Sequence, residues 1–150
     1  MTSVPFFSAS GLISEANDET YGRNKFVSDK ERNQNLLVLK IEEKLKEHSH
    51  IFLDGHFCIF RKGNIPDPLP LDNLEQMHFE KILLLEADPE IILKNLSNRD
   101  NKHYTLENIK KLMETEHQQA KTFSEKTRIP LYIHQMQFDD TDALKLFSFL

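Results

Sequence analysis

Two unbroken apolar runs constrain the fold of this chain more than any other feature. Residues 51–53 and 82–85 contain only apolar side chains, and each run ends in an acid, Asp54 or Glu86. A strand with apolar residues on both faces is buried on both faces, which is the usual state of strands in parallel sheets. The sequence therefore predicts two central strands of a parallel sheet.

The rest of the chain alternates between further strands and helices. Apolar runs at residues 4–9 and 129–133 predict two more strands, the first at a sheet edge because it contains Pro5. Helical periodicity and capping residues predict four helices. The predicted caps include a capping box from Ser28 to Glu31 and the N-cap residues Asp88 and Thr105. These helices span residues 28–47, 89–98, 105–126 and 141–149. The alternation, without regular hairpin signals, predicts an α/β fold of three layers, with helices on both faces of a parallel sheet.

Two segments are predicted to lie outside regular structure. Residues 10–26 mix glycine and polar residues with scattered apolar ones, which indicates a loop or a short helical turn. Residues 65–70 carry three prolines at alternate positions. Because proline fixes φ and has no N–H donor, this stretch is expected to be an extended loop rather than a helix or a central strand.

Size and composition exclude several classes of protein. A chain of 150 residues and 17.6 kDa is expected to form a single domain over residues 1–150, without help from disulfides or a structural metal. The net charge of -5 argues against a nucleic-acid partner. The only cysteine, Cys58, lies in an apolar stretch and is expected to be a buried hydrophobe. No membrane-spanning or secretory segment is recognisable, so we expect a cytoplasmic protein with no membrane partner.

The glycines bear on function. The four glycines stand singly, at positions 11, 22, 55 and 63. Neither G-x-x-x-x-G-K-[ST] nor G-x-G-x-x-G, the loops that cradle phosphates with backbone N–H groups, can be written with this spacing. These 150 residues therefore contain no glycine-rich phosphate loop.

Asp54 is the first candidate for a functional residue. A carboxylate at the carboxyl end of a buried parallel strand can hold the water shell of Mg²⁺ or accept the proton of a substrate hydroxyl, although a strand-end or capping role is the alternative. His56 follows at the same edge and could meet the same ligand, or it could pack against protein or face solvent. Glu114 and His117 share a helix face, but one such pair is too little for a di-metal centre.

The string from Ile51 to Phe57, an apolar strand that ends in Asp-Gly, resembles the second strand motif of P-loop nucleoside and nucleotide kinases. Other segments are similar to parts of the same family in the same chain order, and they cover nearly the whole chain. They are Phe6–Ser10, Asp88–Ile92 followed by Arg99-Asp100, and Ile129–Ile133. The chain thus resembles adenylate-kinase-like, AAA-type ATP-binding proteins. It departs from them in two ways: the first strand and its Walker A loop are absent, and Asn95 stands where the first arginine of a pair is expected, leaving Arg99 alone.

The resemblance implies ATP and Mg²⁺ as cofactors and a nucleoside or nucleotide as substrate class. It implies a catalytic role for Asp54, with Mg²⁺ held through water, and a set of residues that bind substrate or nucleotide. That set is Asp29, Asn33, Gln34, Gly55, His56, Arg99 and Arg128. Because the family's phosphate loop supplies N–H groups, a lysine and a hydroxyl, phosphoryl transfer by this chain is expected to be weak or absent.

The resemblance also implies a domain that is incomplete at its N-terminus, with a gap where the first strand of the family is central in the sheet. A second copy, a partner chain or a rearranged strand order could fill this gap. The alternative to a degenerate kinase is therefore a non-catalytic interaction module that forms a homodimer or binds a dedicated partner. A third interpretation is an unrelated α/β fold that shares only the rhythm of strands and helices.

Overall fold

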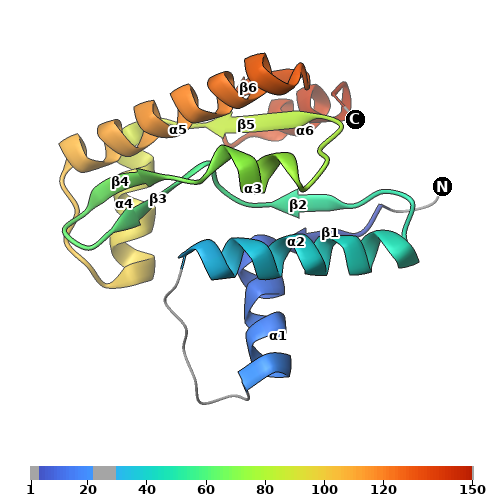
Figure 1. Cartoon of the computed structure of the whole chain (residues 1–150). Helices are drawn as coiled ribbons and strands as arrows, with labels where there is room; N and C mark the ends of the chain where they lie inside the picture. Colours follow the sequence, from blue (N-terminus) through green and yellow to red (C-terminus); the bar gives the residue numbers. More distant parts are fainter. Residues whose placement is uncertain (1–3, 22–29, 150) are drawn as a thin grey trace. The chain divides into compact units, whose positions relative to one another are not determined.

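The computed structural model describes residues 4–21 and 30–149, and every structural statement below concerns this part of the chain (Figure 1). Its contacts divide it into two compact units. Unit 1 contains Met1–His56 and Pro70–His78, and unit 2 contains Phe57–Leu69 and Phe79–Leu150. Each unit has its own parallel strand pair and its own helices.

Unit 1 is built around a short parallel strand pair. β1 (Phe6–Ser8) pairs with β2 (Phe52–Asp54) in the register Phe6↔Phe52 to Ser8↔Asp54. Three helices accompany this pair: α1 (Ala9–Tyr21), α2 (Lys30–Glu47) and α3 (Leu71–Glu75). Because the strands are parallel, their carboxyl ends meet at one edge of the sheet.

Helix α1 occupies most of residues 10–26, where a loop or a short helical turn was expected; residues 22–26 lie outside the described part of the chain. The hydroxyl of Ser8 accepts a hydrogen bond from the Gly11 amide (3.1 Å), which caps the start of the helix. A Cβ at Gly11 would come within 2.7 Å of that hydroxyl, so glycine is needed for this approach. Leu12 and Ala16, one turn apart, are buried and give the helix its apolar face.

Helix α2 confirms the predicted helix, although its expected Ser28 cap lies outside the described residues. Leu37, Val38 and Ile41 are buried along one face, and they follow the predicted helical spacing. Lys40 is also buried, because its ammonium group lies 3.3 Å from the Glu15 carboxylate and 3.0 Å from that of Glu43. This ion-pair group joins α1 to α2.

Unit 2 begins with a hairpin that the sequence interpretation missed. β3 (Cys58–Arg61) pairs antiparallel with β4 (Ile65–Pro68), which occupies most of the stretch expected to be an extended loop. The turn between them uses Gly63 and Asn64 with φ of 83° and 55°, a left-handed backbone that suits these residue types. The expectation of a loop, and of no hairpin, was therefore wrong.

The prolines of β4 are compatible with a strand because of the side they face. The Leu69 amide donates to the Phe57 carbonyl (2.8 Å), so residue 69 turns its backbone groups toward the β3 side of the hairpin. Backbone groups alternate along a strand, which places those of Asp67 on the same side and those of Pro66 and Pro68 on the outer edge. The missing amide donors of the prolines therefore lie on the edge that does not pair with β3, so the hairpin loses no hydrogen bond.

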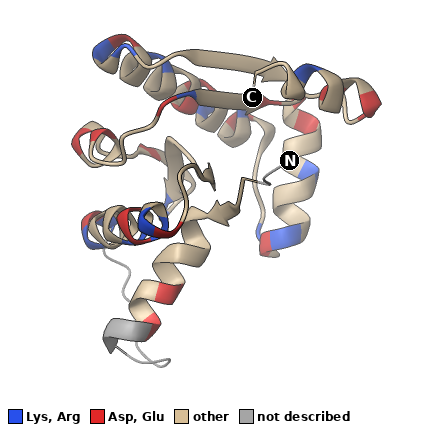
Figure 2. Ribbon diagram, turned by 90° about the vertical axis from the view of Figure 1, so that its right-hand side faces the viewer, with Lys and Arg blue, Asp and Glu red and all other residues tan. Residues whose placement is uncertain are grey.

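The apolar runs at residues 82–85 and 129–133 form the second parallel strand pair, as predicted. β5 (Ile82–Glu86) pairs with β6 (Leu131–Gln135) over five residues, from Ile82↔Leu131 to Glu86↔Gln135. Apart from Glu86 at its end, this pair carries no charged residue, and Figure 2 shows the charges gathered on the helices. The helices of this unit are α4 (Pro89–Asp100), α5 (Leu106–Thr127) and α6 (Asp140–Phe147).

The starts of these helices follow the predicted capping chemistry. Asp88 caps α4 by accepting from the Glu90 amide (2.8 Å). Thr105 and Asn108 form a reciprocal capping box at the start of α5. Helix α5 then supplies the centre of the core, because its Ile109, Ala120 and Phe123 are fully buried.

The α/β class and all four predicted strands are confirmed, but a single three-layer sheet is not what the described residues form. Their strands pair two by two, as β1–β2, β3–β4 and β5–β6. No hydrogen-bonded ladder within the described ranges joins one parallel pair to the other. The parallel pairing of the strands formed by the apolar runs was therefore predicted correctly, whereas their union in one sheet was not. Their expected burial on both faces was also wrong, because Phe52, Leu83 and Leu85 are 39%, 37% and 50% exposed.

Candidate functional site

The carboxyl edge of the β1–β2 pair brings together a hydroxyl and a carboxylate. Ser8 and Asp54 are register partners at the ends of their strands, and α1 begins directly after Ser8. Gly55 lies against the start of α1, since a Cβ built on it would be 3.4 Å from that of Ala9. Asp54 is exposed, so its carboxylate is accessible to a ligand. Such an edge can accept hydrogen bonds from a ligand or hold a hydrated cation.

Asn33 and Gln34 lie near the start of α2, in the same unit as Asp54. The Asn33 side-chain oxygen accepts a hydrogen bond from the Asn17 amide group of α1 (3.5 Å). Gln34 is 6% exposed, and its Oε1 atom is buried without a hydrogen-bond partner. The Asn17 Oδ1 atom is also buried and unpaired. The polar group at α1 and α2 therefore includes Asn17, which the sequence interpretation did not single out.

The next residue of α2 makes a different contact. Asn73 of α3 donates to the side-chain oxygen of Asn35 (2.9 Å), and Asn73 is buried. Helix α3 was not predicted from the sequence, because a helix of five residues next to a proline-rich stretch has too few positions to show a period. Asn33, Gln34 and Asn35 thus have three different environments.

Arg99 and Arg128 belong to unit 2. The guanidinium of Arg99 donates twice to the neighbouring Asp100 carboxylate, at 2.6 and 3.1 Å, and the Tyr104 hydroxyl donates to the same carboxylate at 2.7 Å. The Arg99 hydrogen bond, with that of Tyr104, lowers the pKa of Asp100 to about 2. A phosphate would have to displace Asp100 to use the Arg99 fork. Arg128 is exposed at the end of α5, with a left-handed backbone.

The predicted site residues are thus divided between the units. Asn33, Gln34, Asp54, Gly55 and His56 lie in unit 1, and the two arginines lie in unit 2. Asp29 lies outside the described residues.

Two histidine–carboxylate pairs in unit 2 were not predicted. His117 Nδ1 lies 2.6 Å from Oε1 of Glu86, at the carboxyl end of β5. The sequence showed only that His117 shares a helix face with Glu114. Its contact with Glu86 could not be predicted, because the two residues are 31 positions apart and such a contact has no local signal. The second pair joins His134 Nε2 to Asp142 Oδ1 at 2.7 Å, and both residues are buried.

Asp142 is surrounded by donors. Its carboxylate also accepts from the amides of Gln137 (3.0 Å) and Phe138 (2.7 Å). These bonds, led by that from the Gln137 amide, lower the pKa of Asp142 below its ordinary value. The carboxylate fastens the end of β6 and the following turn to α6, which is a structural role.

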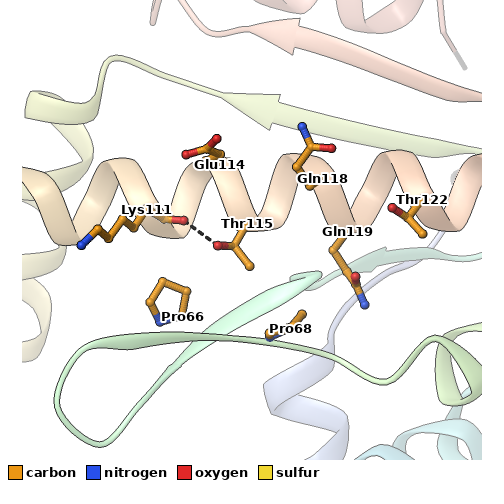
Figure 3. A pocket seen from close by; sticks show the side chains of 8 residues that line it. All are labelled: Pro66, Pro68, Lys111, Glu114, Thr115, Gln118, Gln119 and Thr122. Atoms are coloured by element: carbon orange, nitrogen blue, oxygen red, sulfur yellow. Dashed lines mark hydrogen bonds between the residues drawn. The ribbon is translucent and has the colours of Figure 1, made fainter.

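A shallow groove lies between β4 and α5, with a volume of about 480 Å³ (Figure 3). Its walls are two proline rings and a polar face of α5. The lining residues are Pro66, Pro68, Lys111, Glu114, Thr115, Gln118, Gln119 and Thr122. Figure 3 shows Thr115 and Gln119 pointing toward the proline strand and Gln118 pointing away from it. None of the predicted site residues lines this groove.

The residues present fit the implied cofactors only in part. Asp54 can serve as one carboxylate for Mg²⁺, which often uses one or two carboxylates together with phosphate oxygens. Within the described ranges, no group of three or more His, Cys, Asp or Glu side chains could hold a metal ion. The glycine-rich loop that would hold ATP phosphates is not in the sequence. No helix of the described part is long and apolar enough to cross a membrane.

The comparison with protein families matches residues 2–113 to the AAA domain. The chain belongs to the AAA domain family. The match covers most of the chain and includes both strands of unit 1, the hairpin and β5. This AAA domain is P-loop NTPase-like, which agrees with the family type inferred from the Asp-Gly strand motif. Among curated proteins, none matches this chain.

Proposed function

We propose that this AAA domain protein binds a nucleoside or nucleotide at the carboxyl edge of the β1–β2 pair. The observation that carries the proposal is the meeting of Ser8 and Asp54 at this edge, beside the start of α1, in a chain of a P-loop NTPase-like family. Ligands of α/β proteins bind at the carboxyl ends of parallel strands. Asn33 and Gln34 supply further polar groups in the same unit.

In this proposal, Asp54 holds the water shell of Mg²⁺ that accompanies nucleotide phosphates, and it accepts the proton of a substrate hydroxyl if transfer occurs. Arg99 contributes only when a phosphate replaces Asp100 at its guanidinium. Because the 150 residues hold no phosphate loop, this chain alone binds nucleotide weakly and transfers phosphoryl groups slowly or not at all.

Replacing Asp54 by alanine tests the site. Calorimetric titration with ATP in the presence of Mg²⁺ should show an affinity about tenfold lower in Asp54→Ala, because the only carboxylate predicted at this edge is lost. Asp18→Ala is the matched control, since Asp18 is an exposed acid of α1 in the same unit. Equal affinities for the Asp54 variant and the parent chain would remove Asp54 from the site. Phosphoryl transfer at an ordinary kinase rate would contradict the proposed weak activity.

A second candidate function, a module that binds a partner strand, is favoured by the free side of β5. β5 pairs only with β6 among the described strands, so no described strand pairs with its other edge. On one face of this pair, Leu83 and Leu85 are 37% and 50% exposed. Unlike β4, this strand has no proline at its edge. An unpaired apolar strand edge is a template for pairing with another chain.

Under this second function, the protein should elute as a homodimer, and Leu85→Lys should shift it to monomer, because a charge enters the apolar contact. Light scattering after gel filtration measures the mass. Leu144→Lys is the control, since Leu144 is an exposed leucine on α6 of the same unit. A parent chain that is monomeric and binds nucleotide would count against this function.

A further inference from the structure

The groove between β4 and α5 lies wholly within unit 2, and one of its walls is the outer edge of β4 (Figure 3). Pro66 and Pro68 line the groove, and each is paired with β3 at a position where no backbone hydrogen bond can be exchanged, because proline has no N–H. Their carbonyl groups therefore point to the outer edge. This wall offers acceptors to a ligand and no backbone donor beside them.

The opposite wall is a face of α5 whose donors are already engaged within the protein. Thr115 and Gln119 point toward the proline strand (Figure 3). The Thr115 hydroxyl donates to the Lys111 carbonyl (2.8 Å), and Nε2 of Gln119 donates to the Leu69 carbonyl (2.6 Å). Their oxygen atoms remain as acceptors. The ammonium group of Lys111 is engaged by the Glu107 carboxylate at 2.7 Å. A ligand that suits this groove must therefore bring donors.

The spacing of the two proline carbonyls indicates the shape of the donor group. Equivalent groups two residues apart on a strand are about 6.6–6.8 Å apart. One nitrogen or one water molecule that makes two hydrogen bonds of about 3 Å spans at most about 6 Å, so an ammonium group cannot bridge both carbonyls. A guanidinium carries its donors on separate nitrogens of one planar group and has no acceptor. It can donate to both carbonyls at once.

The charge and the apolar surface of the groove also suit an arginine side chain. Glu114 is the only carboxylate among the lining residues, and it is exposed. It makes no hydrogen bond or ion pair with any residue that the structure describes. A carboxylate on the rim favours a cationic ligand over a neutral one. The rings of Pro66 and Pro68 offer apolar surface on which the methylene stem of an arginine can lie.

We propose that the groove between β4 and α5 binds an arginine side chain of a partner peptide, with the guanidinium on the carbonyls of Pro66 and Pro68. The groove contains none of the residues proposed to bind a nucleotide. This interaction surface is therefore independent of the proposed nucleotide site, and either can exist without the other.

Three peptides test the proposal on the full chain. They have the form acetyl-Gly-X-Gly-amide, where X is arginine, lysine or citrulline, and citrulline is an uncharged analogue in which oxygen replaces one terminal nitrogen of the guanidinium. Titrations followed by amide NMR shifts should give an affinity for the arginine peptide at least about fivefold higher than for either of the others. The shifts should centre on residues 111–122 of α5.

Two outcomes of these titrations would overturn the proposal. Equal affinities for the arginine peptide and either of the other peptides would show that the groove does not select a guanidinium. An arginine peptide that causes no shifts in this segment at millimolar concentration would show that the groove does not bind it.

Substitutions on α5 locate the site. Thr115→Val keeps the shape of the side chain and removes an acceptor, and Glu114→Gln removes the charge of the rim. Each should weaken binding of the arginine peptide about threefold. Glu125→Gln is the matched control, because Glu125 is an exposed acid of the same helix that does not line the groove, and it should leave the affinity unchanged. Equal losses in the two glutamate variants would indicate a general effect of charge and would overturn the site.

Discussion

Replacing Phe123 by alanine should lower the free energy of unfolding by about 3–5 kcal/mol, the range for removal of a fully buried phenylalanine. Phe123 of α5 has no exposed surface, and its ring lies 5.8 Å from that of Phe57 and 6.2 Å from that of Phe79. The substitution removes these contacts and leaves a cavity in the centre of unit 2. Urea unfolding followed by circular dichroism measures the loss.

Phe147 provides the comparison for this experiment. It is also a helical phenylalanine of unit 2, but 73% of its surface is exposed. Phe147→Ala should therefore change the free energy of unfolding by no more than about 0.5 kcal/mol. Similar losses in the two variants would contradict the assignment of Phe123 to the core.

Asp142→Ala should give the second large effect, a fall in Tm of at least about 5 °C, because three donors lose their shared acceptor. The His134 ring and the amides of Gln137 and Phe138 would lose the Asp142 carboxylate as their hydrogen-bond acceptor. Thermal unfolding at neutral pH measures the change. Asp140→Ala, an exposed acid in the same helix, should change the Tm far less. Equal falls in Tm for Asp142→Ala and Asp140→Ala would show that the hydrogen bonds to Asp142 do not determine its contribution to stability.

The same carboxylate predicts a dependence on pH. The pKa of Asp142 is lowered from 3.8 in the folded chain, so the unfolded chain binds this proton more readily. Its contribution to stability is therefore complete above pH 3.8 and is lost as the pH falls below that value through the folded pKa. The difference in Tm between the parent chain and Asp142→Ala should shrink over the same interval.

The sequence predicted the elements whose signal is local and strong. The apolar runs at 51–53 and 82–85 became strands of parallel pairs, and Asp88 and Thr105 cap the helices that follow them. The hairpin was missed because proline normally excludes a ladder, and which edge a proline faces depends on the pairing partner. Helix α1 was missed because Gly11 suggested a loop, whereas the glycine accommodates the Ser8 cap.

The candidate site could be predicted in part for the same reason. Asp54 was recognised from its place at the end of an apolar strand, but its register partner Ser8 was not, because pairing between distant strands cannot be read from either one. The engagement of Arg99 by Asp100 depends on side-chain conformation rather than residue type. The unpaired oxygen of Gln34 depends on the packing around α2, which no local pattern encodes.

The prolines of β4 have a consequence for how the hairpin sheet can grow. The outer side of this strand presents carbonyl groups at Pro66 and Pro68 but no amide hydrogen, so an incoming strand would find acceptors without donors. The outer side of β3 keeps both kinds of group, because Phe60 carries an amide as well as a carbonyl. Addition of a strand to this sheet is therefore disfavoured at β4, where the amide donors that pairing requires are missing.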